Sequence, residues 1–156
     1  LSEAKSGQRA SHEQEMLNAV QNHGYDFVVL AGYRKILSPF FVNACSSQDS
    51  EPTFSRILNV HPSLLPAFVG LNGYAQAFQY GVKVTGVTVH LVNQELDAGP
   101  ICAQESFDIS DCQSIEEVEK KGLSVEHRLY PQTIDWILNQ PWKLQDRGKR
   151  SYVLPC

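Results

Sequence analysis

The hydrophobic pattern of the first thirty residues predicts a helix followed by a buried strand. Residues 1–10 are polar without a regular period and predict a loop. Residues 11–24 place apolar side chains on one helical face, from a capping-box sequence at Ser11 to a closing Gly24. Residues 27–31 are apolar throughout, which is typical of a strand covered on both faces. A helix that leads through a short turn into such a strand predicts half of a βαβ unit.

The rest of the chain continues this alternation of helices and strands. Strict alternation over residues 82–92 predicts the clearest strand, which we expect at or near an edge of the sheet. Pro131 should kink or divide the last helix, and residues 139–156 are expected to form a mobile tail. Together these segments predict one α/β domain over residues 1–156, with a mostly parallel, Rossmann-like sheet flanked by helices. The other predicted elements are a helix that Ser38 and Pro39 begin, a strand at 56–60, a helix at 74–80, a strand at 100–107 after a turn at 97–99, and a helix from Ser114 to Leu138.

The charge balance and the cysteines narrow the classes of function. Thirteen Lys and Arg residues against seventeen Asp and Glu residues give a net charge of −4. Because nucleic acids and anionic membranes attract a basic excess, neither is an expected partner. No apolar run approaches the roughly 20 residues of a membrane helix. The four cysteines form no C-x-x-C pair, which argues against a zinc site or a disulfide framework and favours the reducing cytoplasm.

Two polar side chains stand at the carboxyl end of the predicted strand at residues 56–60. Asn59 and His61 are two positions apart, so the period of a strand places them on one face. Ligands of open α/β sheets bind just beyond the carboxyl ends of the strands. An amide N–H beside an imidazole is suited to bind a developing oxyanion. The alternative is structural: Asn59 would bond a turn, and His61 would be a satisfied residue of the core.

A second imidazole and a carboxylate follow in the alternating strand and the turn after it. His90 lies near the end of this strand and Asp97 lies in the turn, so both could face the same pocket as His61. Such a carboxylate–imidazole cluster is suited to proton transfer. Asp97 before Ala-Gly-Pro is also an ordinary turn residue. The sequence has no G-x-S-x-G, H-E-x-x-H or P-loop motif and no histidine spacing typical of a metal site, so no metal is expected.

Three motifs follow one another in a distinctive order along the chain. They are Asn59-Val-His61-Pro-Ser-Leu-Leu-Pro66, Gly86-Val-Thr-Val-His90 and Glu95-Leu-Asp97-Ala-Gly-Pro100. Together they closely resemble the phosphoribosylglycinamide formyltransferase family, and the resemblance extends over residues 10–138. It implies the formyltransferase fold and the transfer of a formyl group from 10-formyltetrahydrofolate to the amine of glycinamide ribonucleotide in purine biosynthesis. The implied partners are these small molecules, bound by a monomer or homodimer in the cytoplasm.

The resemblance also implies roles for individual residues. Asn59, His61 and Asp97 match the family's catalytic residues: Asn59 and His61 would stabilise the oxyanion, and Asp97 would hold His61 charged. Asn59 and Glu126 would contact the acceptor, Glu126 on its ribose side. From its position, His90 is expected to support the catalytic cluster. The implied folate contacts are Arg34, Lys35 and Leu37, largely through backbone groups to the pterin, and the loop of Asn93, Gln94, Glu95, Leu96 and Asp97 that closes over it.

The sequence departs from this family in two places. The family begins with a strand and a Gly/Ser-rich loop that binds the phosphate of the acceptor, and neither is visible here. We therefore expect the amino-terminal segment to be absent and this chain alone to bind the acceptor weakly. Leu71-Asn72-Gly73-Tyr74 replaces a Leu-His-x-His pattern, which changes the polar surroundings of the pocket.

Other activities stay open on the sequence. Formyltetrahydrofolate deformylase uses a similar Asn/His/Asp set with water as the acceptor; Tyr74 is compatible with it, whereas Pro62 favours the transferase. A formyltransferase that acts on initiator tRNA or a nucleotide sugar is a second rival, and the acidic chain argues against tRNA. A non-catalytic folate-binding remnant would explain the absent phosphate loop, but not the retained Asn59, His61 and Asp97.

Overall fold

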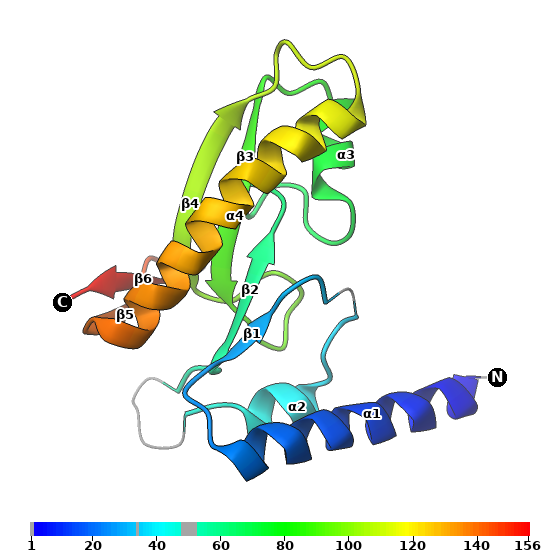
Figure 1. Cartoon of the computed structure of the whole chain (residues 1–156), viewed down its shortest axis with the longest axis vertical. Coiled ribbons are helices and arrows are strands. Elements are labelled where there is room, and N and C mark those ends of the chain that lie inside the picture. Colours follow the sequence, from blue (N-terminus) through cyan, green and yellow to red (C-terminus); the bar gives the residue numbers. More distant parts are fainter. Residues whose placement is uncertain (1, 34, 48–52) are drawn as a thin grey trace.

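The computed structural model describes residues 2–33, 35–47 and 53–156, and the side chains from residue 9 onward. Helices and strands alternate along the described chain (Figure 1). The helices are α1 (Ser2–His23), α2 (Pro39–Ala44), α3 (Gly73–Gln79) and α4 (Ile115–Asn139). The strands are β1 (Val28–Leu30), β2 (Ile57–His61), β3 (Val84–Leu91), β4 (Ile101–Asp108), β5 (Trp142–Asp146) and β6 (Ser151–Pro155).

The described strands form one mixed, 6-stranded sheet in the order β1-β2-β3-β4-β6-β5. β1 pairs with β2, and β4 pairs with β6, in parallel, whereas the β2–β3, β3–β4 and β5–β6 pairs are antiparallel. The predicted α/β class, with helices against one sheet, is confirmed, but the sheet is less parallel than the sequence indicated. The connections explain this, because β3 and β4 form a hairpin across residues 92–100, and strands joined in this way are antiparallel.

β3 lies in the middle of the sheet and not at its edge, where its alternating pattern had placed it. Every residue of β3 after Val84 is buried, although Thr and His alternate with apolar side chains. Buried polar side chains are usually hydrogen-bonded, and Thr88 meets this requirement. The Thr88 hydroxyl donates to the Ser63 carbonyl over 2.7 Å and accepts from the Leu65 N–H over 3.0 Å. At Thr88 the alternation therefore marks a satisfied polar group within the core rather than a solvent-facing side, whereas the buried Thr85 hydroxyl has no hydrogen-bond partner in the described part of the chain.

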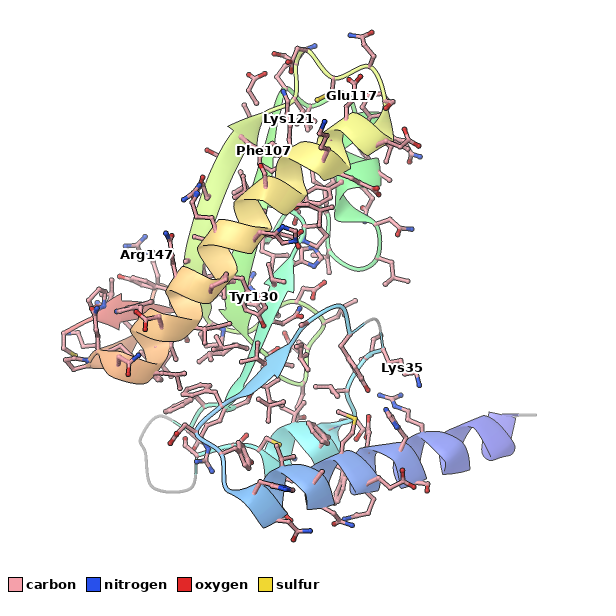
Figure 2. All side chains as sticks on the ribbon, viewed as in Figure 1. Lys35, Phe107, Glu117, Lys121, Tyr130 and Arg147 are labelled. Atoms are coloured by element: carbon pink, nitrogen blue, oxygen red, sulfur yellow. The ribbon has the colours of Figure 1, made fainter. Side chains whose placement is uncertain are left out.

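α4 covers the sheet along β3 and β4, with α3 beside it, while α1 and α2 lie together below β1 in Figure 1. Val118 and Ile137 are buried at the two ends of α4. Between them, Tyr130 faces the strands (Figure 2), and its hydroxyl lies 3.1 Å from the Leu30 carbonyl and 2.9 Å from the Leu58 carbonyl. Because one carbonyl belongs to β1 and the other to β2, Tyr130 fixes α4 to both strands.

The two long helices differ from their predictions. α1 begins at Ser2, so the segment expected as a loop is helical, and Ser11 contacts Glu15 within the helix over 3.5 Å instead of capping it. Ala, Lys, Gln and Arg, which are good helix formers, occupy much of that segment. α4 runs through Pro131 without dividing, since buried side chains on both sides of the proline hold both halves against the sheet. Within the described residues, no helix combines the length and the apolarity that a membrane crossing requires.

The cap of α2 agrees with its prediction and fixes the end of the loop that leads from β1. Ser38 accepts a hydrogen bond from the Phe41 N–H over 3.3 Å, and Pro39 occupies the first helical position. The buried Glu13 of α1 accepts from the Ser38 N–H over 2.9 Å and from the Ser38 hydroxyl. These bonds tie α1 and α2 to one another at this cap.

The segment expected as a mobile tail is part of the sheet. β5 and β6 form a hairpin, and β6 extends the sheet beyond β4 through the pairing of Ile101 with Tyr152. Trp142 packs edge-on against Phe54, with ring centroids 4.9 Å apart, and Val153 is buried. Apolar contact therefore holds this hairpin against the body of the domain.

Candidate active site

The register between β2 and β3 brings together two side chains that the sequence had singled out. Asn59 on β2 is directly opposite His90 on β3, and cross-strand partners project on the same face of a sheet. The Nδ2 atom of Asn59 lies 3.3 Å from Nε2 of His90. His61 ends β2 two residues further on, so the strand period places it on this face as well.

Asp97 reaches the same face from the turn between β3 and β4. Its Oδ2 atom lies 3.4 Å from Nδ1 of His61, and its Oδ1 atom lies 4.0 Å from Nε2 of His90. The same Oδ2 atom accepts from the Gly70 N–H over 2.8 Å. The side chains of His61, Asp97 and His90 are 5%, 9% and 2% exposed, so water screens their interaction little. The structure thus gathers Asn59, His61, His90 and Asp97 into one buried cluster.

The protonation of His90 follows from its partners. Its Nδ1 atom lies 2.9 Å from the Leu91 carbonyl, a contact that requires an N–H at Nδ1. Burial lowers the pKa of His90 to about 4, against the smaller opposing effects of Leu91 and Asp97. The ring is therefore neutral at pH 7, and the lone pair on Nε2 accepts an N–H of Asn59. This contact uses one of the two N–H bonds of the Asn59 amide and leaves the other for a ligand.

His61 lies between two oxygen acceptors. Its Nε2 atom lies 2.9 Å from the Phe68 carbonyl, and its Nδ1 atom faces Asp97. An imidazolium, which donates from both nitrogens, suits this arrangement. Phe68 and Asp97 both have the positive φ angles, 52° and 51°, that residues other than glycine rarely adopt. Residues in such conformations cluster at functional sites, where the surrounding structure holds them in place.

The residues expected to contact folate are only partly brought together. Arg34 lies outside the described residues. Lys35 is exposed on the loop from β1 to α2 (Figure 2), whereas Leu37 belongs to the apolar core around α1 and α2. Glu95 and Leu96 are exposed in the turn that carries Asp97. Within the described part of the chain, the side chains of Lys35, Leu37, Glu95 and Leu96 therefore do not share one environment, and contacts of folate with their backbone groups stay a prediction.

A cavity of about 360 Å³ opens beside the β3–β4 turn. Asn93 and Gln94 line it together with Val42 and Asn43 of α2, and the β5–β6 hairpin closes another side. Gln94 donates to the Asn43 side-chain oxygen over 2.8 Å, which links the turn to α2. The Oδ1 atom of Asn93 is buried without a hydrogen-bond partner in the described part of the chain. A donor from a bound ligand would satisfy this oxygen.

Glu126, expected on the ribose side of the acceptor, contacts α3. Its Oε1 atom accepts from the hydroxyl of Tyr74 over 2.6 Å. Burial, reinforced by Glu126, raises the pKa of Tyr74, so its hydroxyl stays protonated and donates. α4 makes room for the ring at Gly122, where a Cβ atom would overlap Tyr74. Tyr74, which departs from the family pattern, is therefore closely packed by its surroundings and holds the carboxylate of Glu126.

Sequence reasoning missed Arg150 at this site. Its guanidinium donates from Nη2 to the Asp97 carbonyl over 2.6 Å and from Nε to the Gly99 carbonyl over 2.9 Å. The sequence carries no signal for this contact beyond a basic tail, because the pairing of β6 with β4 that places Arg150 there is a long-range feature.

Comparisons with known proteins identify the family of this chain. The formyl transferase family model matches residues 1–134. The chain is 35% identical over 143 residues to phosphoribosylglycinamide formyltransferase of Bacillus subtilis (strain 168), which covers 92% of this chain and 67% of that protein. It is 36% identical over 146 residues to formyltetrahydrofolate deformylase of Escherichia coli (strain K12), and the aligned region covers 94% of this chain and 49% of that protein.

A solved structure supports the same assignment. The crystal structure of phosphoribosylglycinamide formyltransferase from Bacillus halodurans superposes with a TM-score of 0.72 at 44% identity, covering 81% of this chain and 61% of that one. The chain thus spans between about half and two thirds of the length of these relatives. The resemblance found in the sequence is confirmed: the chain belongs to the formyl transferase family.

Proposed function

We propose that the protein transfers the formyl group of 10-formyltetrahydrofolate to the amine of glycinamide ribonucleotide. The observation that carries the proposal is the buried cluster in which His61 lies 3.4 Å from Asp97 while Asn59 is oriented by His90. The names of the relatives at 35% and 44% identity point to the same reaction. The proposed setting is purine biosynthesis in the cytoplasm, where the four cysteines, all free thiols, would stay reduced.

The proposed chemistry needs no covalent bond to the protein. The acceptor amine attacks the formyl carbon, and the carbonyl oxygen becomes an oxyanion in a tetrahedral intermediate. The free N–H of Asn59 and the imidazolium of His61 would donate to that oxygen, His61 exchanging its present acceptor, the Phe68 carbonyl, for the oxyanion. Because these donors are already oriented, their hydrogen bonds become stronger as negative charge develops on the carbonyl oxygen. This lowers the activation barrier of the transfer.

Proton transfer completes the proposed reaction. The attacking amine must lose a proton, and the departing N10 nitrogen of tetrahydrofolate must gain one. Asp97, whose Oδ2 atom lies 3.4 Å from Nδ1 of His61, would favour the charged form of that imidazole, and it would accept the first proton and return it, directly or through water. The carbon–nitrogen bond to the acceptor forms, the bond to N10 breaks, and the protein regains its starting protonation state.

We propose that the two substrates approach the cluster from different sides. The folate would lie against the β3–β4 turn, with Asn93 and Gln94 in the adjoining cavity, and would also contact Lys35 on the loop from β1 to α2. The unpartnered Oδ1 atom of Asn93 would accept from a pterin N–H. The acceptor would lie on the α3–α4 side, where Tyr74 holds Glu126 toward the ribose hydroxyls.

Hydrolysis of 10-formyltetrahydrofolate is the second candidate. The deformylase relative at 36% identity favours it, and Tyr74, which stands where the transferase family often has a histidine, is compatible with it. Water would then replace the acceptor amine at the same cluster, and formate would be released.

One assay separates these functions. The full-length protein is incubated with 10-formyltetrahydrofolate, with and without glycinamide ribonucleotide, and tetrahydrofolate release is followed. Release that depends on the acceptor supports the transferase, whereas equal release without it supports the deformylase. No release of tetrahydrofolate under either condition would refute both activities, and folate binding without catalysis would be the remaining function.

A further inference from the structure

The β5–β6 turn reaches the candidate active site through one side chain. Arg150 donates from Nη2 to the carbonyl of Asp97 over 2.6 Å and from Nε to the carbonyl of Gly99 over 2.9 Å. Arg150 is half-buried, and burial lowers the pKa of its guanidinium from an already high value. The group stays charged, so both hydrogen bonds are charge-assisted.

The turn that Arg150 contacts is held in an uncommon conformation. Asp97 has a φ angle of 51°, a left-handed value that is uncommon for residues other than glycine, although aspartate tolerates it better than most. Gly99 passes so close to the Leu91 carbonyl that a Cβ atom would overlap it. The turn also closes through the hydrogen bond from the Leu91 N–H to the Pro100 carbonyl over 2.8 Å. The backbone of Asp97 thus has little room to relax without a change in this network.

A guanidinium is well suited to fix such a turn. Its N–H groups lie in a rigid plane, so two of them bonded to carbonyls two residues apart set the orientation of the peptides between them. The peptide orientation sets the direction of the Asp97 side chain, whose Oδ2 atom meets His61 at 3.4 Å and the Gly70 N–H at 2.8 Å. A small rotation of the turn would break both contacts.

We propose that Arg150 is a positioning residue that acts through Asp97, so that the carboxy-terminal hairpin is part of the catalytic apparatus. The inference rests on the proposed function, because it assigns a role only if Asp97 takes part in the reaction. Arg150 binds the backbone of the turn and reaches the chemistry through the carboxylate that the turn carries. Its removal affects the rate of the reaction rather than the affinity for the acceptor.

A neighbouring arginine provides a matched control. Arg147 lies on the same β5–β6 turn (Figure 2), where its guanidinium stacks 4.4 Å from the ring centroid of Tyr152 and donates to the Tyr152 hydroxyl over 3.2 Å. Arg147 is exposed. Arg147→Ala therefore removes an arginine from this hairpin without touching the turn of Asp97.

The test compares Arg150→Ala, Arg150→Lys and Arg147→Ala in the full-length protein by steady-state kinetics and thermal unfolding. Arg150→Ala is expected to lower kcat by about tenfold to a hundredfold, since a small misplacement of a catalytic group costs that much. The KM for the acceptor and the Tm should change little. Arg150→Lys, which can make only one of the two bonds at a time, should fall between. Arg147→Ala should match the wild type, and added guanidinium ion should restore part of the rate of Arg150→Ala.

A double-mutant cycle shows whether Arg150 acts through Asp97. If it does, Arg150→Ala combined with Asp97→Asn is no slower in single turnover than Asp97→Asn alone. Multiplied losses, or an Arg150→Ala enzyme with normal kcat, would overturn the inference. The inference would also be overturned if the rate of Arg150→Lys fell only in step with a lowered Tm and guanidinium ion restored no activity to Arg150→Ala. If Asp97→Asn itself keeps its rate, the proposed function fails first, which distinguishes the two failures.

Discussion

Acidification should destabilise the protein through His90, and His90→Gln should remove that sensitivity. His90 is 2% exposed, and burial lowers its pKa to about 4 from a reference value of 6.5. In the unfolded chain the same imidazole binds a proton below pH 6.5. In the folded protein the imidazole stays neutral until the pH approaches 4. Between pH 6.5 and pH 4 the unfolded state therefore binds more protons than the folded state. The contribution of neutral His90 to stability is therefore complete above pH 6.5 and is lost as the pH falls toward 4.

The size of the effect follows from the difference between the two pKa values. One pKa unit corresponds to about 1.4 kcal/mol, so the loss relative to neutral pH is about 2 kcal/mol at pH 5 and about 3 kcal/mol at pH 4. Glutamine cannot bind the proton, and its side-chain oxygen can still accept from Asn59. Glutamine is expected to pack less well than histidine, so His90→Gln should be the less stable protein at neutral pH. As the pH falls, its free energy of unfolding should approach and then exceed that of the wild type.

Urea denaturation at several pH values between 7 and 4 measures this difference directly. Carboxylates far from His90 are present in both proteins and cancel in the comparison, whereas Asp97, whose Oδ1 atom lies 4.0 Å from Nε2 of His90, is coupled to it. His127→Gln, at an exposed position on α4, controls for the removal of a histidine and should follow the wild type. A stability difference between wild type and His90→Gln that does not change with pH would refute the assignment of His90 as a neutral, buried partner of Asn59.

Three further substitutions test how the helices support the site. Tyr74→Phe removes the 2.6 Å hydrogen bond to Glu126 and should raise the KM for the acceptor several-fold at nearly constant kcat. Tyr80→Phe, at an exposed ring, is the control and should leave this KM unchanged. Equal KM values for the two variants would contradict the proposed acceptor side. Gly122→Ala forces a methyl group into the Tyr74 ring and should cost about 1–3 kcal/mol in urea denaturation, and an unchanged midpoint would show that the ring can move away. Tyr130→Phe removes the hydroxyl that meets carbonyls of β1 and β2 and should cost about 1 kcal/mol; no loss would mean that packing alone holds α4.

The grouping of Asn59, His61 and Asp97 could be predicted from the sequence because its parts are locally encoded. The strand period puts Asn59 and His61 on one face, and the hairpin around the Asp97-Ala-Gly turn returns the chain to the same edge. The pairing of Asn59 with His90 depends on the register between β2 and β3, which no local pattern fixes.

The errors lie where tertiary contacts decide the outcome. β3 alternates as a half-exposed strand does, yet partners such as Ser63 and Leu65 satisfy Thr88 inside the core. The tail carries a cluster of basic residues, but Trp142 and Val153 anchor it and bring Arg150 to the turn of Asp97. Sequence patterns report local periodicity, whereas these contacts join residues far apart in the chain.

The central claim is that this cluster performs chemistry on a formyl group, and a single-turnover measurement of His61→Ala in the full-length protein tests it most directly. Formyl transfer to glycinamide ribonucleotide and folate binding are measured on the same preparation. The account predicts folate binding close to that of the wild type and a chemical step slower by about 10²–10³-fold, the usual loss when an oxyanion donor is removed. A variant that binds folate and transfers the formyl group at nearly the wild-type rate would contradict the account.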